Sequence, residues 1–243
     1  MFHFDKNFGL YVGKLTDNVY HKHYALQISV STKSKLELSI KKEKKLYRKS
    51  FFINSKVEHC LVSNSNQLTI LINPLSPVGH QFHLQFRKSN FAKLEDNLSN
   101  KIIETLGQFE TSKVSFKVLC EKINLILEQY QCACASENHL DDERIFNAIK
   151  YMDTNFEKVL SLEEIAEKCF LSSTRFLHLF KEKTNLTFRR YQLWNKLIKS
   201  LPFLVKHSIT ETAHSFGFSD SSHYTRTFKE TFGVTPKLLK PKI

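Results

Sequence analysis

Apolar residues near the end of the chain recur at the spacing of an α-helix. Tyr224, Phe228 and Phe232 follow one another every four residues, so a helix would place them on one face. Small hydroxyl and basic side chains occupy the opposite face, namely Ser221, Ser222, Thr225, Arg226 and Lys229. The pattern predicts a helix that packs on one side and presents short polar groups and cations on the other. Such a face suits contact with a polyanion whose base edges it can read.

The same pattern occurs once before, at an offset of 47 residues that becomes 48 after one insertion. Each copy opens with a Ser followed by a Glu three residues later, at Ser161 and at Ser208, which is the signature of a capping box. A second Ser, at Ser172 and at Ser219, is expected to cap the second helix of each copy. Each copy therefore predicts a helix, a tight turn and a second helix, and the chain contains two helix-turn-helix units.

These motifs resemble the AraC/XylS family of transcriptional regulators, over about Asp142 to Lys240. The resemblance implies an all-α DNA-binding domain at residues 141–243, with two helix-turn-helix units joined by a helix. Two departures stand out: Phe170 occupies a turn position where the family commonly has Gly, and Pro202 lies inside the connecting helix. The matching segments are Ile165-Ala166, Leu171-Ser172, Leu179-Phe180-Lys181, Phe188–Tyr191, Gly217-Phe218 and Phe228–Pro236.

The resemblance also implies which side chains contact DNA. Arg226 and His178 are the strongest candidates for reading sequence, since an Arg can hold both acceptors of a guanine in the major groove. The full set of expected base-reading residues is Thr174, Leu177, His178, Ser221, Ser222, Thr225 and Arg226. The expected phosphate contacts, which fix register without reading sequence, are Ser173, Arg175, Lys181, Arg189, Arg190 and Lys229.

The connecting helix has to set the two reading helices one turn of DNA apart, roughly 34 Å. We expect it from Thr187 to about Leu204, and 17 or so residues give on the order of 25 Å of helix. Pro202 removes a backbone donor and is expected to kink or end this helix. A preceding helix over Asp141–Asn155, with Ile145, Ile149 and Met152 on one side, is expected to brace the first unit.

The N-terminal part has the shorter periodicity of strands. Five alternating or β-branched runs are separated by turns rich in Lys, Ser and Asn, and a turn at Pro74–Pro77 closes the segment. The runs are Tyr24–Val30, Leu36–Ile40, Ser50–Ile53, Glu58–Val62 and Leu68–Ile72. The fold class expected is α+β with two domains, in which an antiparallel barrel or sandwich at residues 1–95 precedes the helical DNA-binding domain.

The N-terminal segment resembles the cupin-type sensory domain of many AraC relatives, here in degenerate form. The trace is His21 and His23 one residue apart, Gln27 where cupin metal sites usually have Glu, and a later His59. The glycines and proline that shape cupin motifs are absent, so we expect these four residues to line an effector pocket. No metal, cofactor or catalytic residue is predicted. A cupin-type metal-dependent enzyme fused to a DNA-binding domain is one alternative left open.

Residues 96–140 are expected to form a helical linker, with helices at Asn97–Leu106 and Lys113–Tyr130. The second has an apolar seam at three- and four-residue spacing. In the resembling family such helices often dimerise, so we expect a homodimer; the alternative is that the seam packs on the chain's own barrel. Cys132 and Cys134, with His139 nearby, are interpreted as an incidental pair rather than a metal or redox site. The seam residues are Phe116, Leu119, Ile123, Ile126, Leu127 and Tyr130.

Composition narrows the function further. The chain of 243 residues has a net charge of +12, and residues 175–243 contribute +9 of it, as expected of a DNA-binding domain. No long apolar run and no signal peptide are present, and five scattered cysteines indicate a reducing compartment, so a cytoplasmic protein without membrane association is expected. No catalytic motif is found. We predict a sequence-specific regulator with DNA, a small-molecule effector and RNA polymerase as partners; the alternative is an effector-independent architectural DNA-binding protein.

Overall fold

A computed structural model describes residues 1–5, 7–40, 44–134, 139–156 and 160–239. The chain separates into two compact units, one built from Met1–Ala133 and the other from Cys134–Phe228 with the residues from Pro236 onward; Lys229–Thr235 are grouped with the first. The first unit contains the strands and three helices, and the second contains only helices. The fold class predicted from the sequence, an antiparallel β domain followed by a helical domain with two helix-turn-helix units, is confirmed.

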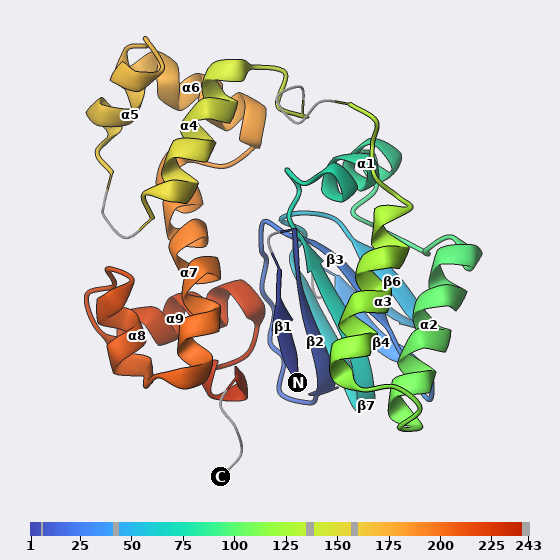
Figure 1. The fold of residues 1–243 in the computed structure, drawn as a ribbon. Coiled ribbons are helices and arrows are strands. Elements are labelled where there is room, and N and C mark those ends of the chain that lie inside the picture. The colour runs from blue at the N-terminus through green and yellow to red at the C-terminus, as the bar shows by residue number, and fades with distance from the viewer. Residues whose placement is uncertain (6, 41–43, 135–138, 157–159, 240–243) are drawn as a thin grey trace. The chain divides into compact units, whose positions relative to one another are not determined.

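Eight antiparallel strands form the β part of the first unit (Figure 1). Neighbouring strands follow the order β1-β2-β7-β3-β6-β8, while β4 pairs with β7 and with β5. Among the described residues these pairings do not close into a barrel, because β1 and β8 end the path. The strands are β1 Phe2–Phe4, β2 Phe8–Leu15, β3 Leu26–Val30, β4 Leu36–Ile40, β5 Lys44–Arg48, β6 Ser50–Ile53, β7 His59–Ile72 and β8 Phe91–Ala92.

The long strand β7 joins two segments that the sequence pattern predicts as separate strands. Its start, His59–Val62, pairs with β4, and its end, Leu68–Ile72, lies between β2 and β3. The intervening Ser and Asn residues were expected to form a turn. They stay extended instead, and the pairing with β2 shifts register here: Gly13 lies opposite Gln67 and Leu15 opposite Ser63, so the extra residues lie on β7. Without a Gly or Pro in this run, nothing in its backbone demands a turn.

The two faces of strand β3 differ in character, and this difference positions a candidate site. Leu26, Ile28 and Val30 alternate with Gln27 and Ser29, and all five are buried. The apolar face joins a large core with the helices that cover the sheet. The polar face lies on the opposite side, where a smaller apolar cluster packs. That cluster consists of Leu15, Leu36, Leu38, Ile40, Phe51, Ile53, Val57 and Leu61.

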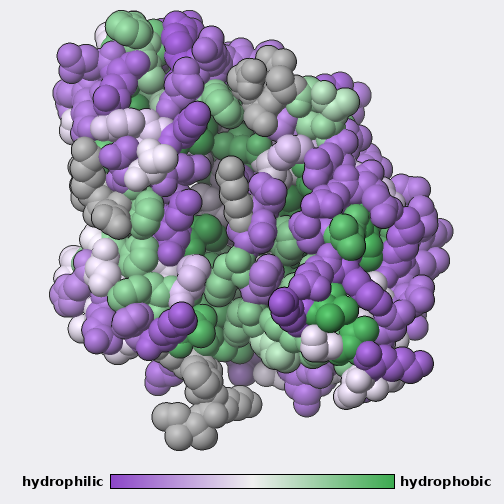
Figure 2. All heavy atoms as spheres, viewed as in Figure 1, coloured by the Kyte–Doolittle hydropathy of each residue, from purple (hydrophilic) through white to green (hydrophobic). Residues whose placement is uncertain are grey.

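Three helices complete the first unit: α1 Pro77–Phe86, α2 Asp96–Glu110 and α3 Phe116–Glu128. Helix α1 was not predicted from the sequence, where only a turn was expected; Ser76 caps it by accepting a hydrogen bond from the Gly79 amide at 3.0 Å. The apolar seam of α3 is buried in the chain's own core, with Leu119 and Ile123 fully buried. The seam therefore packs within the chain, which is the alternative to the dimer interface considered from the sequence. Hydrophilic residues dominate the outer surface of α2 and α3, interrupted by a few hydrophobic ones (Figure 2).

The second unit is built around helix α7, which spans Phe188–Lys206. The other helices are α4 Glu143–Thr154, α5 Leu162–Lys168, α6 Ser173–Thr184, α8 Ile209–Ser215 and α9 Ser221–Phe232, followed by a 3₁₀ turn at Pro236–Leu239. No helix in the described ranges is both long and apolar enough to cross a bilayer.

The prediction that Pro202 could end the connecting helix is wrong, because α7 continues through it for another turn. Proline still removes the hydrogen bond that residue 202 would donate to the carbonyl of Ile198. Leu201 and Leu204, which flank it, are buried, while Pro202 itself is exposed. Packing on both sides of the proline therefore holds the helix together despite the missing bond.

Candidate nucleic-acid interface

The first helix-turn-helix consists of α5 and α6. Ser161 and Ser172 cap these helices as predicted, each accepting a hydrogen bond from the amide three residues later. Phe176 and Phe180 of α6 are fully buried, and their rings lie 5.4 Å apart. They pack edge-on against Phe188 at the start of α7. The apolar face of α6 is thereby fixed, which leaves the opposite face to solvent.

The second helix-turn-helix, α8 and α9, repeats this design with one change. Ser208 and Glu211 form a complete capping box at the start of α8. Helix α9 is capped by Asp220, whose Oδ1 accepts from the amides of Ser222 at 2.7 Å and His223 at 2.8 Å. The prediction that Ser219 is this cap is wrong by one residue, because the insertion between the copies falls here. The bonds that Asp220 accepts hold the pKa of its carboxyl below the usual value.

Tyr224 anchors α9 to the connecting helix. Its side chain is fully buried, and its hydroxyl lies 2.8 Å from the hydroxyl of Ser200 on α7. Burial raises the pKa of Tyr224 to about 12, so the phenol stays neutral and can share this hydrogen bond. Ser200 also donates to the carbonyl of Leu197. The second reading helix is therefore tied to α7 by a ring and a hydrogen bond together.

The turns of the two units differ in one residue. Phe170 and Gly217 occupy equivalent positions, and both have a left-handed backbone, with φ of 54° and 66°. The left-handed region costs a residue with a Cβ roughly 1–2 kcal/mol, whereas Gly adopts it freely. The Phe170 side chain is also 95% exposed. Phe170, which stands where the family commonly has glycine, is therefore a strained residue in the turn of the first helix-turn-helix.

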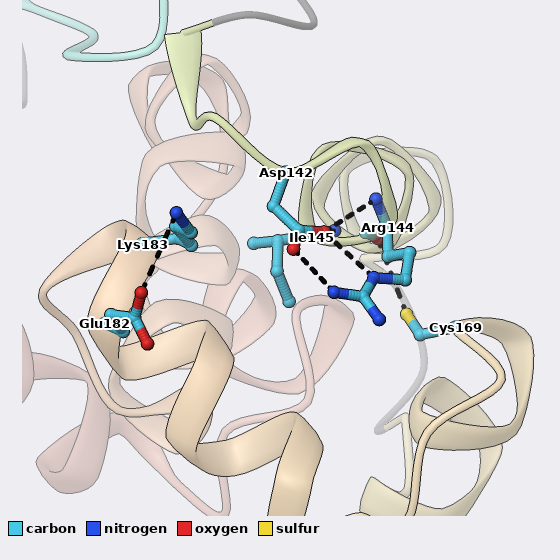
Figure 3. A network of polar contacts seen from close by, with 6 residues as sticks. All are labelled: Asp142, Arg144, Ile145, Cys169, Glu182 and Lys183. Carbon is cyan, nitrogen blue, oxygen red and sulfur yellow. Dashed lines mark hydrogen bonds and ion pairs between the residues drawn. The ribbon is translucent and has the colours of Figure 1, made fainter.

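Helix α4 braces the first helix-turn-helix, as expected from the sequence. Ile145, Ile149 and Met152 are buried, and Asn195 of α7 donates to the Met152 carbonyl at 3.1 Å. Asp142 caps α4 and pairs with Arg144 at 2.8 Å; the guanidinium lowers the pKa of that carboxyl. Figure 3 shows this network and, beside it, Cys169 at the end of α5, whose thiol donates to the Arg144 carbonyl at 3.5 Å.

The residues expected to contact DNA lie on the surfaces of α6, α7 and α9 or are half-buried there. In α6, Thr174, Arg175 and His178 are exposed, and Leu177 is 39% exposed. Among the described residues, Arg226 of α9 has no hydrogen-bond or ion-pair partner, so its guanidinium is available to a ligand. Lys181, Arg189, Arg190, Ser222 and Lys229 are exposed as well, while Ser173, Ser221 and Thr225 are half-buried.

A shallow hollow of about 680 Å³ lies over α6. Arg175, His178 and Lys181 line it, together with Glu182 and Asn185, which were not among the predicted site residues. Glu182 lies 3.7 Å from Lys183 (Figure 3). The geometry places Arg175 with His178 and Lys181 rather than apart from them. Spacing along the helix could have identified Glu182 and Asn185, since residues 178, 181, 182 and 185 follow one another at three, one and three residues.

The structure also brings together the four residues expected to line an effector pocket. His21, His23, His59 and Gln27 are each at most 6% exposed. Backbone hydrogen bonds in both directions between His21 and His59, at 3.0 and 2.9 Å, hold these two side by side. One ring nitrogen from each histidine lies within 4.8 Å of the others. Burial lowers the pKa of His21 to about 3 and lowers those of His23 and His59 also.

A buried row of polar side chains continues from this cluster along the interior face of β3 and β7. Gln27 donates to Ser29 at 3.0 Å, and Ser29 shares a hydrogen bond with Thr69 at 2.8 Å. Thr69 in turn donates to Gln67 at 2.8 Å. The Nε2 atom of Gln67 is buried and has no hydrogen-bond partner among the described residues. A buried donor without an acceptor is costly, so this row is suited to a polar ligand.

Comparisons with known proteins agree with the two-unit design. A family model described as a helix-turn-helix domain, of the AraC type, matches residues 165–240. The chain is 24% identical over 227 residues to a protein named "Probable transcriptional regulator LumQ" from Photobacterium leiognathi, covering 89% of this chain and 90% of that one. It is 30% identical over 164 residues to the transcriptional activator RhaS of Escherichia fergusonii, covering 66% of this chain but only 55% of RhaS.

This chain therefore carries an AraC-type helix-turn-helix domain at residues 165–240. Its fold is similar to that of ToxT from Vibrio cholerae, with a TM-score of 0.64 and 15% identity to the apo form of a point variant, over 97% of both chains. A second ToxT structure, described as bound to an unsaturated fatty acid, gives a TM-score of 0.59 over 98% of this chain. At this level of identity the likeness establishes the fold, and an AraC-type regulator binds DNA through its helix-turn-helix domain.

Within the AraC-type domain, α7 carries the two reading helices at its opposite ends (Figure 1). Its 19 residues correspond to about 28 Å of helix. Hydrogen bonds hold the first half of α7 to the first helix-turn-helix, where Gln192 donates to the carbonyl of Leu160 at 2.8 Å. The bond between Ser200 and Tyr224 holds its second half to α9. The connecting helix is thus a fixed spacer between the two helix-turn-helix units.

Proposed function

We propose that this regulator reads a bipartite DNA site, with α6 in one major groove and α9 in the next. The observation that supports this best is the unpaired, exposed Arg226 on a helix whose opposite face is locked by Tyr224. A rigid helix with a free guanidinium can place it against the two acceptors of a guanine. Ser221, Ser222 and Thr225 lie beside it as the smaller readers.

In the first unit we propose that Thr174, Leu177 and His178 face the bases. Leu177 presents an apolar surface at 39% exposure, which suits the methyl group of a thymine. Arg175 and Lys181 lie with His178 on the same hollow and would hold the phosphates that flank these bases. Ser173 at the start of α6, Arg189 and Arg190 at the start of α7, and Lys229 on α9 complete the proposed phosphate contacts.

We further propose that the N-terminal domain responds to a small-molecule effector. ToxT, which shares the fold, has been described with a bound unsaturated fatty acid. In this chain the buried polar row from Gln27 to Gln67, with an unsatisfied donor at its end, supports a ligand site in the same domain. His21, His23, Gln27 and His59 line one end of that row. Contact with RNA polymerase is part of the same proposal.

A homodimer is also proposed, although the seam on α3 does not support it, since the chain's own core covers that seam. The outer face of α3 carries Leu125, which is 59% exposed. Sedimentation of the full chain would test self-association, and Leu125→Glu would abolish it if this face is the interface.

The experiment that tests the DNA proposal is selection of duplexes from a random pool by the full chain. We expect two conserved blocks about one helical turn apart, roughly 10 base pairs. Binding is then measured across a salt series for selected and scrambled duplexes. Equal affinity for both, falling steeply with salt, would contradict sequence reading and support the architectural alternative.

A further inference from the structure

The three buried histidines share a hydrogen-bond pattern that determines where their protons are. The Nδ1 atom of His21 lies 2.8 Å from the carbonyl of Val19. Those of His23 and His59 lie 2.9 and 2.8 Å from the carbonyls of Ala25 and Val57. A carbonyl oxygen only accepts, so each Nδ1 carries the proton. In a neutral ring the lone pair then resides on Nε2.

Gln27 adds a fourth acceptor at the same place. Its Nε2 donates to Ser29 at 3.0 Å, and this orients the amide so that Oε1 faces the histidines. The Oε1 atom lies 2.9 Å from Nε2 of His23 and 3.2 Å from Nε2 of His59. With both Nδ1 atoms protonated, these contacts bring an oxygen lone pair against two nitrogen lone pairs. A cation at the centre would satisfy all three of these lone pairs at once.

A proton is a poor source for that charge. Doubly protonating a ring would place a cation among side chains that are at most 6% exposed. Burial works against this and keeps the rings neutral. No carboxylate belongs to the cluster, so an imidazolium there would have no counter-charge from these four residues. A metal ion differs because it bonds directly to all the converging lone pairs.

From this geometry we infer that His21, His23, His59 and Gln27 bind a divalent transition-metal ion such as Zn²⁺. Three imidazoles with one amide oxygen match the ligand preference of zinc, nickel or iron(II), whereas Mg²⁺ and Ca²⁺ need more oxygens. Histidine ligands in metal sites characteristically donate their other N–H to a carbonyl or carboxylate, as all three rings do here. The sequence alone favoured a pocket without metal, because Gln replaces Glu and the cupin glycines are missing.

Residues of the sheet hold the ligand side chains in place. The row Ser29, Thr69 and Gln67 fixes the Gln27 amide, and the paired backbones of His21 and His59 fix two of the rings. Bonds to zinc of 2.0–2.1 Å place tetrahedral ligand atoms about 3.3 Å apart, so ring nitrogens within 4.8 Å of one another need only small side-chain rotations. The inference deepens the proposed effector site, since it names a metal ion as a ligand there.

The test uses the full chain without an affinity tag, stripped with a chelator and titrated with Zn²⁺ and with Co²⁺. We expect one ion bound to this cluster and a higher Tm when it is bound. His59→Gln should weaken that binding by roughly a hundredfold, since a ligand contributes at least as much as its supporting partners. Gln27→Glu should strengthen it by roughly tenfold, because a carboxylate binds the ion more tightly than an amide. His214→Gln, an exposed histidine on α8, is the matched control.

Thiols elsewhere in the chain bind the same ions, so the cobalt spectrum serves as a second readout. Cobalt at this cluster should show ligand-field bands without a sulfur-to-metal charge-transfer band, and His59→Gln should remove those bands. Wild-type protein that binds no ion at the cluster, or Gln27→Glu that leaves the affinity unchanged, would overturn the inference. The Gln27→Glu comparison decides the matter even if His59→Gln fails to fold.

DNA affinity for the selected duplex is measured on the same samples with and without metal. If metal binding fails while the duplex is still bound in a sequence-dependent way, the inference fails and the DNA proposal stands. If metal binds and sequence reading fails, the reverse holds. The two ideas can therefore be separated in one set of samples.

Discussion

The two helix-turn-helix units share one scaffold and differ in what they present. In both, buried aromatic residues fix the second helix, at Phe176 and Phe180 in one and at Tyr224 and Phe228 in the other. The exposed face of α6 carries His178 and Leu177 between two cations, whereas α9 carries hydroxyls and one Arg. The comparison shows that duplicated packing can present two chemically different surfaces.

The units also differ in strain. The first turn passes through an exposed Phe170 with a left-handed backbone, and the second uses Gly217 at the equivalent place. The residues that follow α6 and α9 show the same contrast, with Asn185 at φ 56° and Gly233 at φ 72°. The first unit therefore forms its turn and its cap at greater cost, and α4 adds buried contacts to that unit.

The largest expected effect comes from breaking the shared packing. Phe176→Ala should lower the free energy of unfolding by about 3–5 kcal/mol, because it leaves a cavity beside Phe180 and Phe188. Tyr224→Ala should cost a similar amount in the second unit. Chemical denaturation with full-length protein measures both. A cost below about 1 kcal/mol for either would contradict the view that these rings fix the reading helices.

The next prediction distinguishes a residue that reads bases from one that contacts phosphate. Arg226→Ala should weaken binding of the selected duplex by about 1–3 kcal/mol while leaving affinity for scrambled DNA nearly unchanged. Arg175→Ala should weaken both duplexes alike and reduce the slope of log affinity against log salt by about 1. Fluorescence anisotropy over a salt series makes the comparison. The reverse assignment of the two effects would show that Arg226 contacts phosphate.

A smaller effect concerns the strained turn. Phe170→Gly should stabilise the chain by about 1 kcal/mol, since it relieves a left-handed backbone and removes only an exposed side chain. Gly217→Ala should destabilise it by about the same amount. Thermal unfolding at constant pH and salt measures both changes. If Phe170→Gly destabilises the chain instead, the exposed ring makes a stabilising contact in solution.

The smallest expected effect removes a single hydrogen bond. Tyr224→Phe keeps the ring and deletes the hydroxyl that meets Ser200, which should cost about 1 kcal/mol of stability. Ser200→Ala should cost a similar amount. The double variant should cost less than the two changes added together, because they remove the same bond.

Sequence patterns predicted the repeated part of the molecule well and the irregular part poorly. The two helix-turn-helix units, their inward aromatic residues and the brace helix α4 were all predicted, because helical spacing and capping residues are local signals. The Asp220 cap was missed by one residue, at the insertion between the copies. Pro202 was expected to interrupt α7, and the buried Leu201 and Leu204 outweigh it. That balance depends on packing, which local sequence does not record.

In the N-terminal domain, helix α1 and strands β1, β2, β5 and β8 were not predicted as elements. Short strands such as Phe2–Phe4 depend on a partner far along the chain, so no local period identifies them. The four residues of the histidine cluster were identified from their types and spacing. Their hydrogen bonds, and hence the inference of a metal ion, depend on the carbonyls of Val19, Ala25 and Val57, which sequence does not place.

The main proposal, that each helix-turn-helix reads its own block of DNA, is tested most sharply by a cycle of protein and DNA changes. Wild type, Arg226→Ala and His178→Ala are each titrated against the selected duplex and against duplexes with one block scrambled. We predict that Arg226→Ala loses its effect when one block is scrambled, and that His178→Ala loses its effect only when the other is. Effects of both variants that stay the same on every duplex would contradict the proposal.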